Sequence, residues 1–175
     1  MSESASSSAA LPIAYAGLRA LVVANWLMAV MILVLLLAMP TRRWIMVSLN
    51  LDPGAEAERV IMGFRTIAVI GLIGVPFNHI VLKRLLSIVE TVRWGEPFVV
   101  ANADRLQTIA WALLVLQVLS IIVGTIAKSI SSPAHPIKLN AGFSIAGWLA
   151  VLLTFILARV FAEGAVMRED LAGMV

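Results

Sequence analysis

The stretch LQTIAWALLVLQVLSIIVGTIA, residues 106–127, decides the fold because it contains 22 consecutive residues without a charge. A helix that crosses the hydrocarbon core of a bilayer needs roughly 20 apolar residues, at about 1.5 Å of rise for each residue. The whole chain is 61% hydrophobic and 13% charged, whereas soluble domains are about half apolar and about a quarter charged. The stretch therefore predicts a transmembrane helix in a membrane protein.

Three further charge-free runs cover residues 20–41, 66–82 and 139–158, with lengths of 22, 17 and 20 residues. Arg65 and Lys83 flank the shortest run, and their long side chains can reach the headgroups and so lengthen it. The runs are continuously apolar, whereas the strands of a membrane barrel alternate between apolar and polar residues. We therefore expect an all-α fold, a bundle of four transmembrane helices made of two helical hairpins. The predicted spans are about residues 17–39, 62–82, 106–127 and 140–161.

The segments outside the spans predict one tail and two helical extensions. Residues 1–14 are rich in Ser and Ala and predict a disordered tail ahead of the membrane domain, residues 15–175. A cleaved signal peptide is the alternative for the first span, but the basic segment expected before it is missing, which favours an uncleaved helix. Apolar residues recur with a helical period in residues 82–93, so the second helix should continue as an amphipathic extension. Residues 159–175 predict a shorter extension of the fourth helix.

The connection between the second and third spans, WGEPFVVANADR (residues 94–105), is rich in residues that end and begin helices. Gly95 suits the C-terminal end of one helix, and Pro97 cannot continue that helix. Asn102 is a favourable N-cap for the next helix. Asp104 would then lie in the first turn, where the helix dipole favours an acid. Structural roles of this kind are sufficient to explain the segment.

An even number of spans places both termini and this connection on one face of the membrane. That face carries seven Lys and Arg residues, against six on the other face. Because Lys and Arg are enriched in cytoplasmic loops, the small excess favours a cytoplasmic location for both termini and for the connection. The basic excess suits a lipid bilayer with anionic headgroups, and we expect no direct binding of nucleic acid.

Two segments resemble a known family. GEPFVVANADRLQTIAW (residues 95–111) is similar to the pattern Gly-x-Pro-Phe-x-x-x-Asn-x-x-Arg-Leu, and LARVFAEGAVMREDLAGMV (residues 157–175) is similar to Phe-x-x-Gly-x-x-x-x-Glu-Asp-Leu-x-x-x-Val. Joined to four spans, they resemble the bacterial proteins of domain-of-unknown-function family 2975. The resemblance implies a small multi-pass protein of the bacterial cytoplasmic (inner) membrane. Members of that family often lie beside a gene for a small helix-turn-helix regulator, so the resemblance also implies a regulatory role with such a partner.

The distinctive polar residues of the chain gather in the connection and in the C-terminal segment, which share the predicted cytoplasmic face. We therefore expect a regulatory or scaffolding protein that binds a partner protein there. The candidate contacts are Arg93, Glu96, Asn102, Asp104, Arg105, Glu163, Glu169 and Asp170.

Asn25, Asn78, His79 and Gln117 lie within the predicted spans, where polar groups are candidates for function. If they face a common path, they favour a small transporter or channel subunit, which would be a homo-oligomer because four short spans enclose little space. An accessory subunit of a larger membrane complex is a further alternative. Alternatively, these residues have only structural roles. Asn25 and Gln117 would then form hydrogen bonds between helices, and each bond would stabilise the fold by about 1 kcal/mol. Polar side chains near Pro76 would then bind carbonyl groups that the proline leaves free.

The chain lacks the patterns on which several enzyme classes depend. It contains no Cys, no His-Glu-x-x-His pattern, no Gly-rich phosphate loop and no Gly-x-Ser-x-Gly elbow. His79 as a haem or pigment ligand would need a second histidine at membrane depth, and His135 lies in a Pro-rich loop. We therefore expect no enzymatic activity, no cofactor and no metal site.

Overall fold

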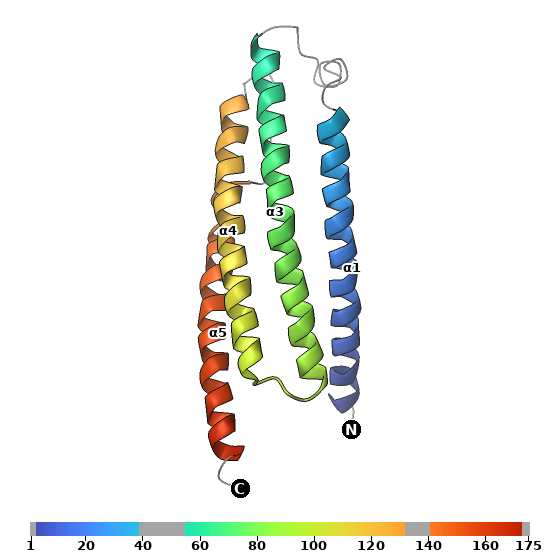
Figure 1. Ribbon diagram of the computed structural model, residues 1–175, viewed down its shortest axis with the longest axis vertical. Helices are drawn as coiled ribbons and strands as arrows, with labels where there is room; N and C mark the ends of the chain where they lie inside the picture. Colours follow the sequence, from blue (N-terminus) through green and yellow to red (C-terminus); the bar gives the residue numbers. More distant parts are fainter. Residues whose placement is uncertain (1–2, 39–54, 132–140, 173–175) are drawn as a thin grey trace.

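The computed structural model describes residues 3–38, 55–131 and 141–172, and these residues are helical apart from short connections (Figure 1). The helices are α1 (Glu3–Ala38), α3 (Ala55–Arg93), α4 (Val100–Ile130) and α5 (Ile145–Ala172). Each is long and apolar enough to cross a membrane. The predicted all-α fold with four candidate spanning helices is therefore confirmed, and it indicates a multi-pass membrane protein.

The helices pack mainly against their neighbours in the chain. Helix α3 packs against α1 and α4, and α4 packs against α3 and α5. Consecutive helices run in opposite directions, so the start of α1, the α3–α4 connection at residues 94–99 and the end of α5 lie together (Figure 1). We call this the joint end of the molecule. Packing does not divide the helices into two hairpins, because α3 packs against α4 as well as against α1.

The helices are longer than the predicted spans. Helix α1 begins at Glu3, which differs from the disordered tail expected over residues 1–14, and α4 begins at Val100, ahead of its span. A charge-free run marks only the hydrocarbon part of a helix, whereas the backbone can stay helical into the headgroup region. Helix α3 has 39 residues and so a length of roughly 58 Å, against about 30 Å for the hydrocarbon core. Most of the Pro-rich loop between the third and fourth predicted spans, including His135, lies outside the described residues.

The main hydrophobic core joins α3, α4 and α5. It is formed by the buried residues Val81, Leu106, Ile109, Ala112 and Ala158, with Phe77, Leu85, Ile88, Leu113 and Phe161 packed around them. Small side chains are frequent at the helix contacts, as in membrane proteins generally, because they let the backbones approach closely. Many large apolar side chains of α1 and α5 stay exposed, among them Leu27 and Leu152. This pattern fits helices whose outer faces are covered by lipid.

The start of α5 is held against α4 by a close backbone contact. A Cβ atom on Gly124 would lie 2.6 Å from the Gly142 Cα and 2.7 Å from the Ala141 carbonyl oxygen. The Ser120 hydroxyl donates to the Gly142 carbonyl at 3.2 Å and lies 3.2 Å from the Gly142 amide nitrogen. Gly142 itself has a φ of +130°, which L side chains rarely adopt. Two glycines and one serine therefore position the segment that leads into α5.

Candidate functional site

The C-terminal end of α3 is closed by a glycine motif. Gly95 has a φ of +79°, and its amide donates to the Val92 carbonyl at 3.1 Å. The Glu96 amide donates to the Thr91 carbonyl at 3.1 Å. These two bonds, with a left-handed glycine between them, form a Schellman motif. The predicted role of Gly95 as the helix stop is confirmed.

Asn102, near the start of α4, is the centre of a hydrogen-bond network that reaches this connection. Its side chain is fully buried, and its Nδ2 donates to the Pro97 carbonyl and to Thr91 Oγ1, both at 2.8 Å. Its Oδ1 accepts a hydrogen bond from Arg105 Nη1 at 2.8 Å. The amide thus ties the connection to both helices that it joins.

The predicted capping roles of Asn102 and Asp104 are wrong. Val99 occupies the N-cap position of α4, without a side-chain hydrogen bond, and the first turn contains no acid. Asn102 lies inside the helix and turns its amide inward, where the half-buried Pro97 carbonyl and Thr91 hydroxyl are its hydrogen-bond partners. The residue type of Asn102 favours an N-cap, but the path of the connection places other hydrogen-bond partners beside its side chain.

Arg105 completes the network from the side of α4. The same Nη1 atom that binds Asn102 also donates to the Ser87 carbonyl at 3.1 Å, and the side chain is half-buried. Ser87 and Thr91, which the helical period assigns to the polar face of α3, are also half-buried and lie toward α4. We call Ser87, Thr91, Pro97, Asn102 and Arg105 the Asn102 network. Sequence analysis named Asn102 and Arg105 as candidate contacts with a partner protein, and Pro97 as a residue that cannot continue α3.

The connection also reaches α5. The Phe98 and Phe161 rings lie 5.3 Å apart between centroids, and a Cβ on Gly164 would lie 3.0 Å from the Phe98 ring. Arg168 of α5 forms an ion pair with Glu96 at 3.4 Å. Two segments that are far apart in the sequence therefore form one surface at the joint end.

Two shallow grooves follow the contact between α4 and α5 at this end, and we call them together the α4–α5 seam. One has a volume of about 280 Å³ and is lined by Ala103, Asp104, Gln107, Phe155, Ala158, Arg159 and Ala162. The other has a volume of about 260 Å³ and is lined by Glu96, Phe98, Val99, Val100, Ala165, Arg168 and Glu169. Both combine an apolar floor with charged edges, which is a surface that another protein segment can bind.

The structure separates the eight candidate contact residues into three groups. Five are exposed, namely Glu96, Asp104, Glu163, Glu169 and Asp170, and of these Glu96, Asp104 and Glu169 line the seam. Asn102 and Arg105 are used inside the chain. Arg93 lies on the opposite side, beside Tyr15 of α1. Sequence analysis did not single out Arg159 and Arg168, which pair with Glu163 at 2.8 Å and with Glu96. The spacing of four residues between Arg159 and Glu163 was the available signal.

The polar residues within the spans occupy two different helix contacts. Between α1 and α3, the buried Asn25 donates to the Val75 carbonyl at 3.3 Å and accepts a hydrogen bond from Asn78 at 3.0 Å. The expected interhelical role of Asn25 is thus confirmed. The carbonyl that Asn25 binds is next to Pro76, and differs from the Leu72 carbonyl that a proline at position 76 leaves free.

Gln117 and His79 form no such bonds among the described residues. Gln117 packs against Gly147 at the contact of α4 with α5, and its buried Oε1 accepts no hydrogen bond from any described residue. The His79 ring lies 5.4 Å from Trp26, edge to face, and its Nδ1 likewise lacks a partner in this part of the chain. A groove of about 320 Å³ beside Asn25 and Asn78 is lined mainly by apolar residues. The four polar residues therefore do not share one contact.

The Asn25–Asn78 pair gives a prediction for stability. In a double-mutant cycle of Asn25→Ala and Asn78→Ala, we expect a coupling energy of about 0.6–1.7 kcal/mol, from the average to the maximum found for interhelical hydrogen bonds in a membrane protein. The measurement is the free energy of unfolding in mixed micelles for the wild type, both single variants and the double variant. Additive effects of the two substitutions would show that this hydrogen bond contributes nothing.

Within the described ranges, no three His, Asp or Glu side chains come together in a way that could hold a metal ion. Comparison of the chain with models of known protein families, with curated proteins and with solved structures found no match.

Proposed function

We propose that this chain is a regulatory or scaffolding protein of the bacterial cytoplasmic membrane, and that it binds a basic partner protein along the α4–α5 seam. Membership in family 2975, which the two sequence segments imply, is part of the proposal. The observation that carries it is the composite surface at the joint end, where Glu96 and Phe98 of the connection contact α5 beside two grooves.

The charges of this surface favour a basic partner. Arg159 and Arg168 are each paired with a glutamate. The other two exposed carboxylates that line the seam, those of Asp104 and Glu169, have no ion pair within the part of the chain that the structure describes. Unpaired acids at the edge of an interface steer a basic partner and select against acidic ones. The apolar floor of the grooves, which includes Phe98 and Phe155, would bury the partner's apolar side chains.

The DNA-binding face of a helix-turn-helix regulator has the required chemistry, since such faces carry Lys and Arg for phosphate contacts. A membrane protein that covers this face would hold the regulator away from DNA. The proposal includes the cytoplasmic orientation of the joint end. It also includes amphipathic extensions of α3 and α5 beyond the hydrocarbon, which the length of α3 and the exposed charges of both helix ends support.

The transporter alternative needs the four intramembrane polar residues on a common path. Asn25 and Asn78 lie between α1 and α3, whereas Gln117 lies against α5. The groove beside the asparagines is predominantly apolar. These positions favour the partner-binding proposal over a path for polar solutes.

Charge reversal on the seam tests the proposal. We expect Asp104→Lys and Glu169→Lys each to weaken binding of a small helix-turn-helix regulator, of the kind that the resemblance to family 2975 implies, by roughly three- to tenfold, which corresponds to about 0.7–1.4 kcal/mol. The measurement is a binding titration of the purified regulator on the protein in detergent or nanodiscs, at low salt.

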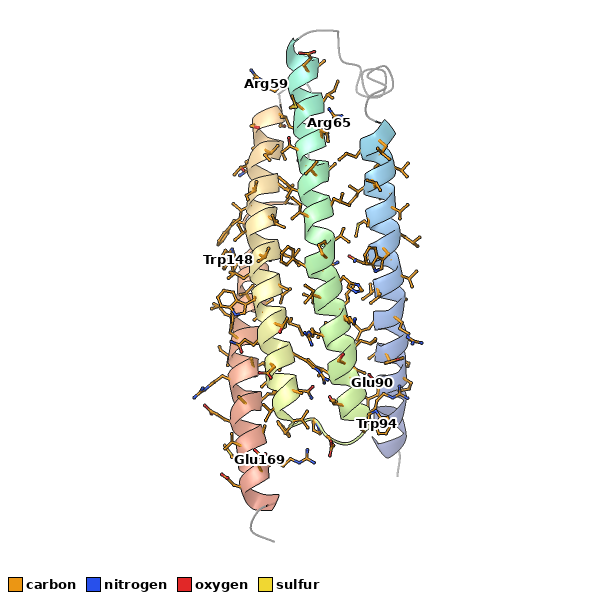
Figure 2. The ribbon with its side chains drawn as sticks, in the orientation of Figure 1. Arg59, Arg65, Glu90, Trp94, Trp148 and Glu169 are labelled. Carbon is orange, nitrogen blue, oxygen red and sulfur yellow. The ribbon has the colours of Figure 1, made fainter. Side chains whose placement is uncertain are left out.

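Glu90→Lys is the matched control, because Glu90 is an exposed acid at the same end (Figure 2) but on α3, outside both grooves. Its affinity should equal that of the wild type. The absence of saturable binding, or an equal loss in all three variants, would contradict the proposed partner surface.

A further inference from the structure

Two arginines share one tyrosine ring on the side of the joint end that faces away from the seam. The guanidinium carbon of Arg19 lies 5.2 Å from the centroid of the Tyr15 ring, and that of Arg93 lies 5.3 Å from the same centroid. Tyr15 and Arg19 are one turn apart on α1, whereas Arg93 is the last residue of α3. We call these three residues the Tyr15 cluster. It joins the ends of two packed helices.

Neither guanidinium of the cluster has an anionic partner among the described residues. The ion pairs of this part of the molecule are Arg159–Glu163 and Arg168–Glu96. Glu90 lies one turn before Arg93 on α3 but forms no ion pair with it in the described chain. A guanidinium carries five N–H donors, so the cluster presents many donors without a carboxylate acceptor.

The shared ring keeps the two positive charges close together. Both distances to the ring lie within the limit of about 6 Å for a cation–π contact, so the charges are separated by no more than about one Debye length, ~10 Å in 0.1 M salt. Their repulsion is therefore only partly screened. An anion that contacts both groups would relieve this repulsion and accept their hydrogen bonds.

The surroundings of the cluster are those of a membrane interface. Trp94, which directly follows Arg93, has 79% of its surface exposed and lies at the joint end (Figure 2). Trp and Tyr side chains are enriched at the level of the lipid headgroups, where one part of the ring is apolar and the other is wet. The exposed apolar residues Val23 and Leu27 follow Arg19 on α1 at intervals of four residues, toward the middle of the helix. A molecule bound here would thus have its charge at the arginines and its chains along α1.

We propose that the Tyr15 cluster is a binding site for the phosphate headgroup of an anionic phospholipid, of the phosphatidylglycerol type. Guanidinium groups match the oxygens of a phosphodiester in a bidentate geometry. A zwitterionic headgroup carries an ammonium that the two arginines repel, so the cluster selects the headgroup with net negative charge. This inference is independent of the proposed partner, because the cluster and the α4–α5 seam share no residue.

Lipid titration of the protein in a neutral detergent tests the inference. With phosphatidylglycerol as the probe, we expect a saturable rise in the melting temperature of the wild type, because a ligand that binds only the folded state stabilises it. Phosphatidylcholine of the same chain composition should give little rise, and so should inorganic phosphate or glycerol phosphate. A rise with free phosphate equal to that with the lipid would overturn the assignment to a lipid headgroup.

Matched neutral substitutions locate the site. One basic residue near a membrane surface changes the affinity for anionic lipid by about 1 kcal/mol, or roughly fivefold. Arg19→Gln with Arg93→Gln should therefore weaken phosphatidylglycerol binding by roughly 25-fold. Lys83→Gln with Arg84→Gln removes the same charge from exposed positions on α3 and should retain nearly the wild-type affinity.

Equal weakening in the two double variants would mean that only the overall charge attracts lipid, and it would overturn the site. Unchanged binding in the Arg19 and Arg93 variant would do the same. The single variant Arg93→Gln, with an expected loss of roughly fivefold, covers the case in which the double variant does not fold. Tyr15→Phe keeps the ring and should bind as the wild type does.

Discussion

Asn102→Ala should lower the free energy of unfolding by about 2–4 kcal/mol. The substitution leaves the half-buried Pro97 carbonyl and Thr91 hydroxyl without the Asn102 amide, and it removes an acceptor from the Arg105 guanidinium. An unsatisfied buried polar group costs about 1–3 kcal/mol, and more when it is charged. The measurement is reversible unfolding in mixed micelles, followed by circular dichroism.

Gln107→Ala is the control for this effect, because Gln107 is an exposed polar residue on the same helix. It should change stability by less than about 0.5 kcal/mol. The loss of stability in Asn102→Asp should lie between the losses in Asn102→Ala and Gln107→Ala. A carboxylate still accepts a hydrogen bond from Arg105, but it cannot donate one to the Pro97 carbonyl. If Asn102→Ala and Gln107→Ala have the same free energy of unfolding, the Asn102 network does not hold the connection in place.

Gly124→Val should destabilise the fold by about 3 kcal/mol, the upper end of the usual range for overpacking. A Cβ at this position meets backbone atoms of Gly142 and Ala141 at 2.6 and 2.7 Å. Backbone atoms cannot rotate away as a side chain can, so the segment that leads into α5 must move. That movement also breaks the contact of Ser120 with Gly142. The loss is measured as a lower melting temperature in detergent.

Gly17→Val is the matched control, because Gly17 is also a helical glycine but a Cβ there has nothing within 4 Å. A glycine inside a helix is unfavourable by about 1 kcal/mol relative to alanine, so we expect this variant to be as stable as the wild type or slightly more stable. Equal stability of the two valine variants would show that α4 and the start of α5 do not approach each other as closely as described.

Features that depend on residue type and short spacing were predictable. The charge-free runs predicted four apolar helices, and the even number of spans predicted that the α3–α4 connection and the end of α5 lie together. Gly95 was predictable as a helix stop because only a residue without a side chain adopts its backbone conformation easily. The interhelical role of Asn25 followed from the need of a buried amide for partners.

The roles of the polar residues at the joint end were not predictable in the same way. The helical period places Ser87 and Thr91 among the polar residues of α3, but it does not show that a second polar surface, that of Asn102 and Arg105, packs against them. Arg105 looks like a boundary residue in the sequence, and its actual acceptors come from α3 and from its own helix. Such pairs are separated by up to 18 residues, beyond the range of local patterns.

Composition and spacing alone therefore predict four helices that are long and apolar enough to cross a membrane, with one connection of unusual polarity. Burial of apolar surface and satisfaction of backbone hydrogen bonds act on every residue of a span, so they leave a pattern that can be read without coordinates. Tertiary structure alone decides which polar side chains become part of the interior and which stay exposed for binding. That choice depends on where α3, α4 and α5 approach one another, and it separates Asn102 and Arg105 from the acids of the seam and from the arginines of the Tyr15 cluster.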